Sequence, residues 1–164
     1  RPNPTLTTGG RHTPGTPPTP RGAAPLADAL ALLADAGRIA DEARTAGYEA
    51  RGRDLDSALA YEHGRVNAYA SEYETSLTAL DKALTLLGEP EAEPGAGPAA
   101  GTEDHVGEWA ECVRLAAVVE GLYLERPDPA LARLDGAVAR LTALGHTEET
   151  ESLTSLAARL RDEE

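Results

Sequence analysis

Three residues with metal-ligating or nucleophilic side chains share one face of a predicted helix. His105, Glu108 and Cys112 are spaced by three and four residues, as are neighbours on a helical surface. Together they offer a nitrogen, an oxygen and a sulfur ligand to a metal ion. A solvated first helical turn accounts for the same residues. We therefore predict no metal site here.

Catalytic arrangements are poorly represented elsewhere in the chain. His63, His105 and His146 are dispersed, and none has a Glu three residues before it or a His four residues away, so neither a di-iron site nor a zincin motif is indicated. Cys112 and His105 lie a turn or more apart on one helix, where nucleophile and base do not meet, and we expect a buried, apolar thiol. The sequence therefore predicts no enzyme, no catalytic residue and no cofactor.

Charge is distributed unevenly along the chain. Residues 1–24 contain three Arg and no acid, whereas the remainder has 12 Lys or Arg against 28 Asp or Glu. An acidic body repels phosphate groups, so we expect neither nucleic acid nor an anionic membrane surface as a partner. A basic protein or peptide suits it better. The alternative is that the acid only keeps a helical domain in solution.

Cysteine usage and hydropathy bear on the compartment. Cys112 is alone, so it forms no intramolecular disulfide and no thiolate zinc cluster. No apolar run reaches the roughly 18 residues of a membrane span, and no signal peptide opens the sequence. These features predict a cytoplasmic protein.

The first part of the chain is predicted to be a tail followed by helices. Residues 1–24 are rich in Thr, Pro and Gly and contain one large apolar side chain, which is typical of disorder. From Pro25 onward, apolar residues recur at three and four positions, the period of a helix. Asp54 is predicted to cap a second helix, and Ser71 with Glu74 has the spacing of a capping box that starts a third.

The second part begins with a low-complexity segment, residues 88–102, which we interpret as a flexible loop. Thr102 is predicted to cap the next helix, which continues through residues 115–124. This stretch is apolar on most sides and is expected at the centre of the fold. Asp128, followed by Pro, begins another helix, and the last helix starts near Thr147. Residues 25–164 are thus expected to form one all-α domain.

A repeat family is visible in residues 57–90. Gly64, Tyr73, Ala83 and Pro90 are placed like the small, aromatic, alanine and terminal proline positions of a tetratricopeptide repeat, and the segment resembles that family. A second window, residues 111–144, has small residues in similar places. The resemblance implies antiparallel helical hairpins stacked into an array.

A seven-residue spacing in the same region favours a different architecture. The positions concerned are Leu59, Val66, Tyr73, Leu80 and Leu87. Their phase runs through the turn that the repeat requires, so a single helix from Asp54 to Leu87 in an antiparallel bundle is the alternative. Such a stripe also predicts a homodimer as a further alternative.

Aromatic and arginine side chains provide the binding candidates. Tyr61, Arg65 and Tyr69 follow at four-residue intervals and form one ridge on a helix. In a tetratricopeptide-like hairpin the matching positions line a peptide-binding groove, and the counterparts in the second window are Val119, Leu122 and Tyr123. Tyr and Arg readily supply interface energy, although the tyrosines would serve equally as the edge of a core.

These observations predict a non-enzymatic, helical interaction domain of adaptor or scaffold type that docks a protein or peptide. A helical regulatory domain that binds a small molecule is the alternative. It is suggested by the apolar segment from Trp109 to Leu124, which contains Glu120.

Overall fold

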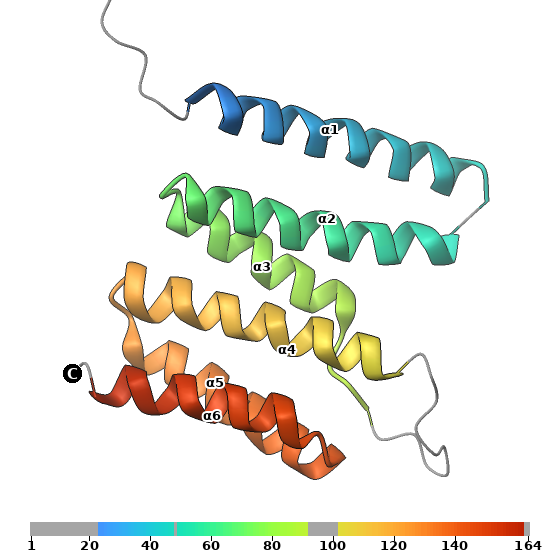
Figure 1. Ribbon diagram of the computed structural model, residues 1–164. Coiled ribbons are helices and arrows are strands. Elements are labelled where there is room, and N and C mark those ends of the chain that lie inside the picture. The colour runs from blue at the N-terminus through green and yellow to red at the C-terminus, as the bar shows by residue number, and fades with distance from the viewer. Residues whose placement is uncertain (1–22, 48, 92–101, 163–164) are drawn as a thin grey trace, which may run out of the picture.

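The protein is all-α, as the sequence predicts (Figure 1). The computed structural model describes residues 23–47, 49–91 and 102–162, and this part of the chain contains helices and no strand. The elements are α1 (Ala23–Thr45), α2 (Glu49–Tyr69), α3 (Tyr73–Leu87), α4 (Thr102–Val118), the π-helix η1 (Val119–Tyr123), α5 (Pro127–Leu144) and α6 (Thr147–Asp162). Within these ranges, no helix has the length and apolar character needed to cross a membrane.

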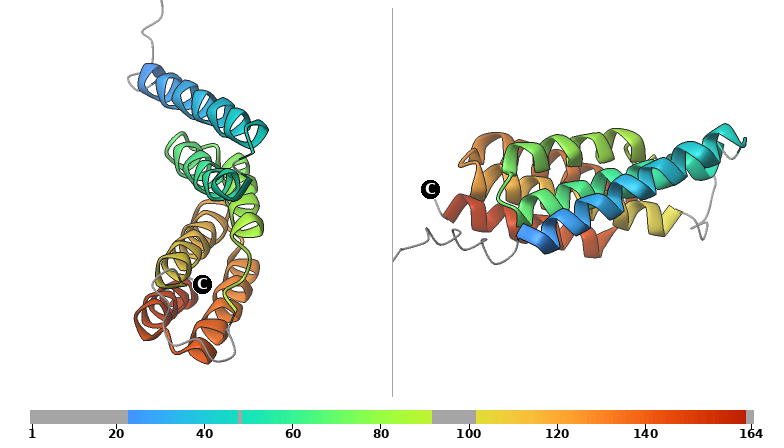
Figure 2. Two further views of the ribbon diagram at one scale, coloured as in Figure 1. Left: turned by 90° about the vertical axis from the view of Figure 1, so that its right-hand side faces the viewer. Right: turned by 90° about the horizontal axis from the view of Figure 1, so that it is seen from above.

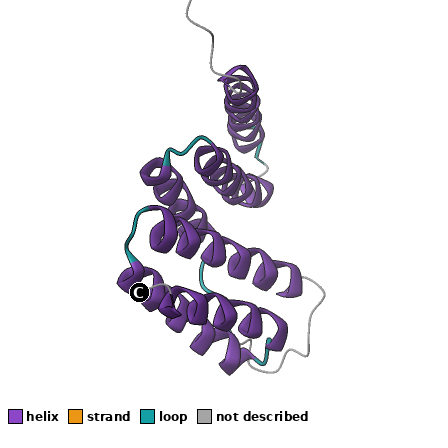
Figure 3. Cartoon of the chain, turned by 60° about the vertical axis from the view of Figure 1, so that its left-hand side comes forward, coloured by secondary structure: helices purple, strands orange, loops and turns teal. Residues whose placement is uncertain are grey.

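Successive helices run in opposite directions and form an elongated, two-layered array. Seen end-on in Figure 2, α2, α4 and α6 lie in one column and α3 and α5 in the other, with α1 packed outside α2. The connections are short where they are described, as Figure 3 shows. The chain therefore consists of antiparallel helical hairpins, which confirms that part of the prediction.

The core has two hydrophobic clusters, and α4 contributes to both of them. Trp109 and Val113 belong to the cluster shared with α5 and α6, whereas Cys112 and Ala116 belong to the cluster shared with α2 and α3. The α4 backbone accordingly lies between the two halves of the array (Figure 1). This confirms the prediction that the apolar helix occupies the centre.

A close approach joins α2 to α3. A Cβ added at Gly64 would lie 2.5 Å from the Cγ of Leu80, so only glycine fits at this contact. Ser76 is fully buried, and its hydroxyl donates a hydrogen bond of 2.7 Å to the carbonyl oxygen of Gly64. Two small residues therefore bring the helices together, and the one buried hydroxyl at the joint has a partner.

The single long helix considered above is wrong, because the chain turns between α2 and α3. Ser71 has φ of 64°, a left-handed conformation that interrupts the helix. The predicted capping box is also wrong, since Glu72 is the N-cap and makes no side-chain cap hydrogen bond. Glu74 instead pairs with Arg126. Leu80, from the seven-residue stripe, is fully buried within the chain, and a homodimer stays a prediction.

Two other predicted helix starts need correction. Helix α2 begins at Glu49, so Asp54 lies inside it and is not its cap. Helix α5 begins at Pro127, and Asp128 lies in its first turn. In both cases the helix begins before the residue that has the local capping signal, by five residues in α2 and by one in α5.

The predicted tail and loop fall mostly outside the described residues, which exclude 1–22 and 92–101. Helix α1 already includes Ala23 and Ala24. At the end of α3, Gly88 has φ of 71°, and Pro90 is buried with its carbonyl oxygen accepting a 2.6 Å hydrogen bond from Nε of Arg140. The chain is thus held against α5 as it leaves α3.

Candidate functional site

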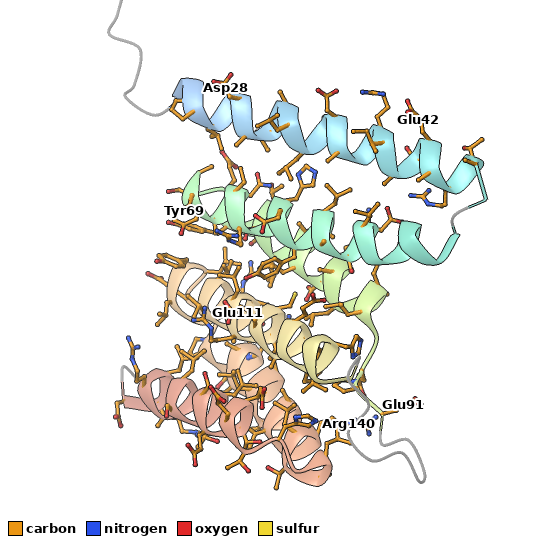
Figure 4. The ribbon with its side chains drawn as sticks, turned by 45° about the vertical axis from the view of Figure 1, so that its right-hand side comes forward. Asp28, Glu42, Tyr69, Glu91, Glu111 and Arg140 are labelled. Carbon is orange, nitrogen blue, oxygen red and sulfur yellow. The ribbon has the colours of Figure 1, made fainter. Side chains whose placement is uncertain are left out.

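A groove between α2 and the end of α4 gathers most of the predicted binding residues. It encloses about 430 Å³ and is lined by Tyr61, Arg65 and Tyr69 from α2 and by Val119 and Tyr123 from η1. Five of the six candidates therefore meet in one place, although they come from two elements about 50 residues apart in the sequence. Figure 4 labels Tyr69 near the end of α2 and Glu111 on the neighbouring α4.

The tyrosines of this groove are arranged for contact. Tyr69 is 85% exposed and Tyr123 is 52% exposed. The ring of Tyr123 stacks on that of Tyr73, with centroids 4.7 Å apart and an interplanar angle of 11°. The guanidinium of Arg65 lies 6.0 Å from the ring centroid of Tyr61, within the range of a cation–π contact. The groove thus has one freely exposed ring and one held by stacking.

Leu122, the sixth candidate, packs against the core cluster shared by α4, α5 and α6 and does not line the groove. The π-helical hydrogen bonds of η1, such as Leu124 N–H to the Val119 carbonyl at 3.0 Å, close between i and i+5. Each residue then advances by a smaller rotation than in an α-helix. As a result Leu122 falls on the side away from Val119, while Tyr123 returns to the groove.

Helix α4 supplies the residues that the sequence did not reveal. Glu111, Arg114, Leu115 and Val118 line the groove opposite α2. Arg114 donates two hydrogen bonds, of 2.6 and 2.7 Å, to the Glu111 carboxylate, and the hydroxyl of Tyr61 lies 3.4 Å from the same group. The spacing of Glu111 and Arg114 is that of a helical ion pair. The sequence around this pair does not indicate that it faces α2.

Electrostatics fix the charge states in the groove. The hydrogen bonds from Arg114 lower the pKa of Glu111, which is therefore ionised at neutral pH. Burial, and then the charge of Glu111, raise the pKa of Tyr61 and keep its phenol protonated. The carboxylate of Glu62, which Arg65 contacts at 2.8 Å, raises the pKa of that arginine. Each cation of the groove is thus matched by one carboxylate.

Acidic side chains continue this face beyond the tyrosines. A neighbouring pocket of about 440 Å³ shares Tyr61 and Glu111 with the groove and adds Glu62 and Glu108. Its other walls are small or apolar and include Leu87. The layer formed by α2 and α4 therefore has an aromatic end and an acidic end, joined at Tyr61 and Glu111.

The face of His105, Glu108 and Cys112 does not assemble into a reactive site. Cys112 is fully buried, and burial raises the pKa of its thiol to about 12, so it stays protonated. His105 has Nε2 2.8 Å from the Leu87 carbonyl oxygen. In the described ranges, no three His, Cys, Asp or Glu side chains are close enough together to hold a metal ion.

Comparison with known proteins does not identify a relative. Searches with protein-family models, of curated proteins and of solved structures each gave no match. The tetratricopeptide resemblance therefore stays a prediction. Of the residues on which it depends, Gly64 makes the close α2–α3 contact, Ala83 is fully buried and Pro90 is buried at the end of the segment.

Proposed function

We propose that this chain is a non-enzymatic, cytoplasmic interaction domain of adaptor or scaffold type, which docks a protein or peptide in the groove between α2 and α4. The observation that carries the proposal is that Tyr61, Arg65, Tyr69, Val119 and Tyr123 line one groove. A tyrosine that is 85% exposed, such as Tyr69, gains apolar contact only when a partner covers it.

The chemistry of the face favours a segment that is apolar at one end and basic at the other. Tyr69 and Tyr123 offer ring surfaces, whereas Glu62, Glu108 and Glu111 surround the neighbouring pocket. Glu108 is exposed and has no ion pair with any described residue. A cation from a partner would therefore gain a carboxylate without displacing an existing pair.

The test compares capture by the intact chain and by two single variants, Tyr69→Ala and Leu32→Ala. Both wild-type side chains are exposed, Leu32 at 70% on α1, so neither change should disturb the fold. Proteins retained by the wild type and by Leu32→Ala, but lost with Tyr69→Ala, would be purified and their affinity measured. Loss of about 2 kcal/mol or more in binding, or roughly 30-fold, is the expected effect of a central tyrosine.

The same proteins bound with equal affinity by all three chains would contradict the proposal. A wild type that binds no protein, and instead turns over a metabolite, would contradict it more completely. Circular dichroism of each variant provides the control for folding.

A second function is favoured by a cleft on the other layer. It encloses about 510 Å³ between α3, α4 and α5, with Trp109 and Val113 in its wall and Arg133 and Arg140 beside them. Its size is typical of small-molecule sites. Glu120 is not free for such a ligand, because Arg133 contacts it at 3.2 Å. Since Trp109 is the single tryptophan, a change in its fluorescence with a metabolite, and not with a protein partner, would favour this function.

A further inference from the structure

The tyrosine groove has the features of a site for a polyproline II segment. Aromatic-lined grooves recognise P-x-x-P segments, which are preformed as extended helices and lose little entropy on binding. Tyr61 and Tyr69 are eight residues apart on α2, or about 12 Å at about 1.5 Å per residue. One P-x-x-P turn advances about 9 Å at about 3.1 Å per residue. The backbone positions of the two tyrosines are therefore separated by one such turn and about 3 Å more.

The chain itself contains a segment with this pattern. Residues 11–21 read RHTPGTPPTPR, in which Pro14, Pro17 and Pro20 recur every three residues and Arg11 continues the same period. In a polyproline II helix, which has three residues per turn, these four side chains share one edge. Residues 1–24 contain no acid, so their charge is opposite to that of the Glu-lined pocket.

We propose that residues 11–21 of the chain dock in the groove between α2 and α4, with the prolines against Tyr61 and Tyr69 and with Arg11 at the Glu62, Glu108 and Glu111 pocket. The inference rests on the proposed function, since it names a ligand for the same groove. It makes the tail an internal competitor of the external partner.

Length and direction both permit this docking. Helix α1 begins at the end of the array where α2 finishes, as Figure 4 shows for Asp28 and Tyr69. To reach the groove the chain must pass α2, which is about 10–12 Å across with its side chains. Pro17 is six residues before Ala23, a reach of about 19 Å at about 3.1 Å per residue. Arg11 then falls beyond Pro14, toward the acidic end of the groove.

A spin label on the tail tests the docking in the full-length chain. Thr16→Cys places a thiol between two prolines, and Cys112 does not compete for the label because it is fully buried. If the tail docks, the amide NMR signals of Tyr69 and Val118 lose most of their intensity, whereas those of Asp135 and Gly136 on α5 keep theirs. Equal losses at both places would overturn the proposal.

Two pairs of variants make the result specific. Arg11→Glu and Arg1→Glu change the net charge equally, but only Arg11 is in the proline period. The signal loss at Tyr69 is expected to diminish with Arg11→Glu and to persist with Arg1→Glu. Tyr69→Ala should relieve the loss at Val118, and Leu32→Ala should not.

A mixed sample tests whether the tail of a second copy occupies the groove. It contains one chain with the spin label and no isotope, and one isotope-labelled chain without the spin label. Signal loss that arises only between molecules would mean that the groove accepts the tail of a second copy, and would overturn docking within one chain. Absence of docking combined with loss of partner binding in Tyr69→Ala would overturn this inference and leave the proposed function standing. With docking, replacing Pro14, Pro17 and Pro20 by Ala raises partner affinity about tenfold if about nine tenths of the molecules were occupied.

Discussion

Helices α1 and α4 both have an apolar stripe, but their surroundings are very different. Both contain apolar residues at helical spacing, yet α1 packs mainly on α2 whereas α4 contacts α3, α5 and α6. Among the described side chains of α1, Ala40 alone is fully buried, whereas Leu32 and Ile39 are exposed. In α4, Cys112, Ala116 and Ala117 are fully buried. An apolar stripe therefore predicts which face of a helix is covered. The number of neighbouring helices determines how many residues of that face are buried.

The largest contrast between the centre and the edge is expected for leucine truncation. Leu134→Ala removes a fully buried side chain from the cluster shared by α4, α5 and α6 and should lower the free energy of unfolding by about 2–5 kcal/mol. Leu32→Ala, at the 70% exposed position in α1, should change it by no more than about 0.5 kcal/mol. Urea denaturation followed by circular dichroism measures both. Similar values would mean that α1 is covered in solution.

Two glycine substitutions compare a packed joint with an open surface. At Gly64 an added Cβ meets Leu80 at 2.5 Å, whereas at Gly136, within α5, it meets nothing within 4 Å. Gly64→Ala should therefore destabilise the protein by about 1–3 kcal/mol through overpacking. Gly136→Ala should stabilise it by about 0.5–1 kcal/mol, because alanine is the better helix former. The thermal unfolding temperatures of the two variants should shift in opposite directions. A rise in both would show that Leu80 moves aside to accommodate the added Cβ.

Hydroxyl groups allow a finer comparison on α3. Ser76→Ala removes the buried donor to the Gly64 carbonyl and should cost about 0.5–1.5 kcal/mol. Thr78 also donates to a carbonyl, that of Glu74 at 2.9 Å, but its side chain is exposed. Thr78→Ala is expected to change stability by less than about 0.5 kcal/mol. If the two free energies of unfolding agree, burial adds nothing to the value of the hydrogen bond at the joint.

The smallest effect at neutral pH concerns the thiol at the centre. Cys112 has a pKa raised from 9.0 to about 12 by burial, so the folded protein keeps the proton that the unfolded chain loses. Its stabilising contribution is complete below pH 9.0 and is lost as the pH rises toward about 12. Denaturation at several alkaline pH values should show this slope in the wild type and a smaller slope in Cys112→Ala. Iodoacetamide should react slowly with the native thiol at pH 8, and rapid alkylation would contradict the burial.

The turn between α2 and α3 illustrates the limit of prediction from sequence. Apolar periodicity is continuous through residues 70–73, and no Gly or Pro marks the break. Ser71 nevertheless adopts positive φ, and the turn lets α3 fold back on α2, where Gly64 lies close to Leu80. The packing energy between α2 and α3 is a tertiary term, which local helix propensity does not encode.

The groove was predictable along α2 and in part on its other side, where Val119 and Tyr123 line it as expected. The four-residue spacing of Tyr61, Arg65 and Tyr69 defines a ridge without any knowledge of its neighbour. Glu111 and Arg114 were missed because their role depends on which helix faces α2. Leu122 was misplaced for a different reason, since sequence periodicity assumes α-helical rotation and η1 does not follow it.

The position of Tyr123 in the groove depends on the number of residues in η1 as well as on their types. A π turn contains one residue more than the α-helical turn it replaces. Within η1, Glu120 contacts Arg133 and the ring of Tyr123 stacks on that of Tyr73. Deleting one residue before Tyr123 would retain every tyrosine and still turn this ring away from its partner. Insertions and deletions within residues 119–123 are therefore expected to alter recognition more than most substitutions there.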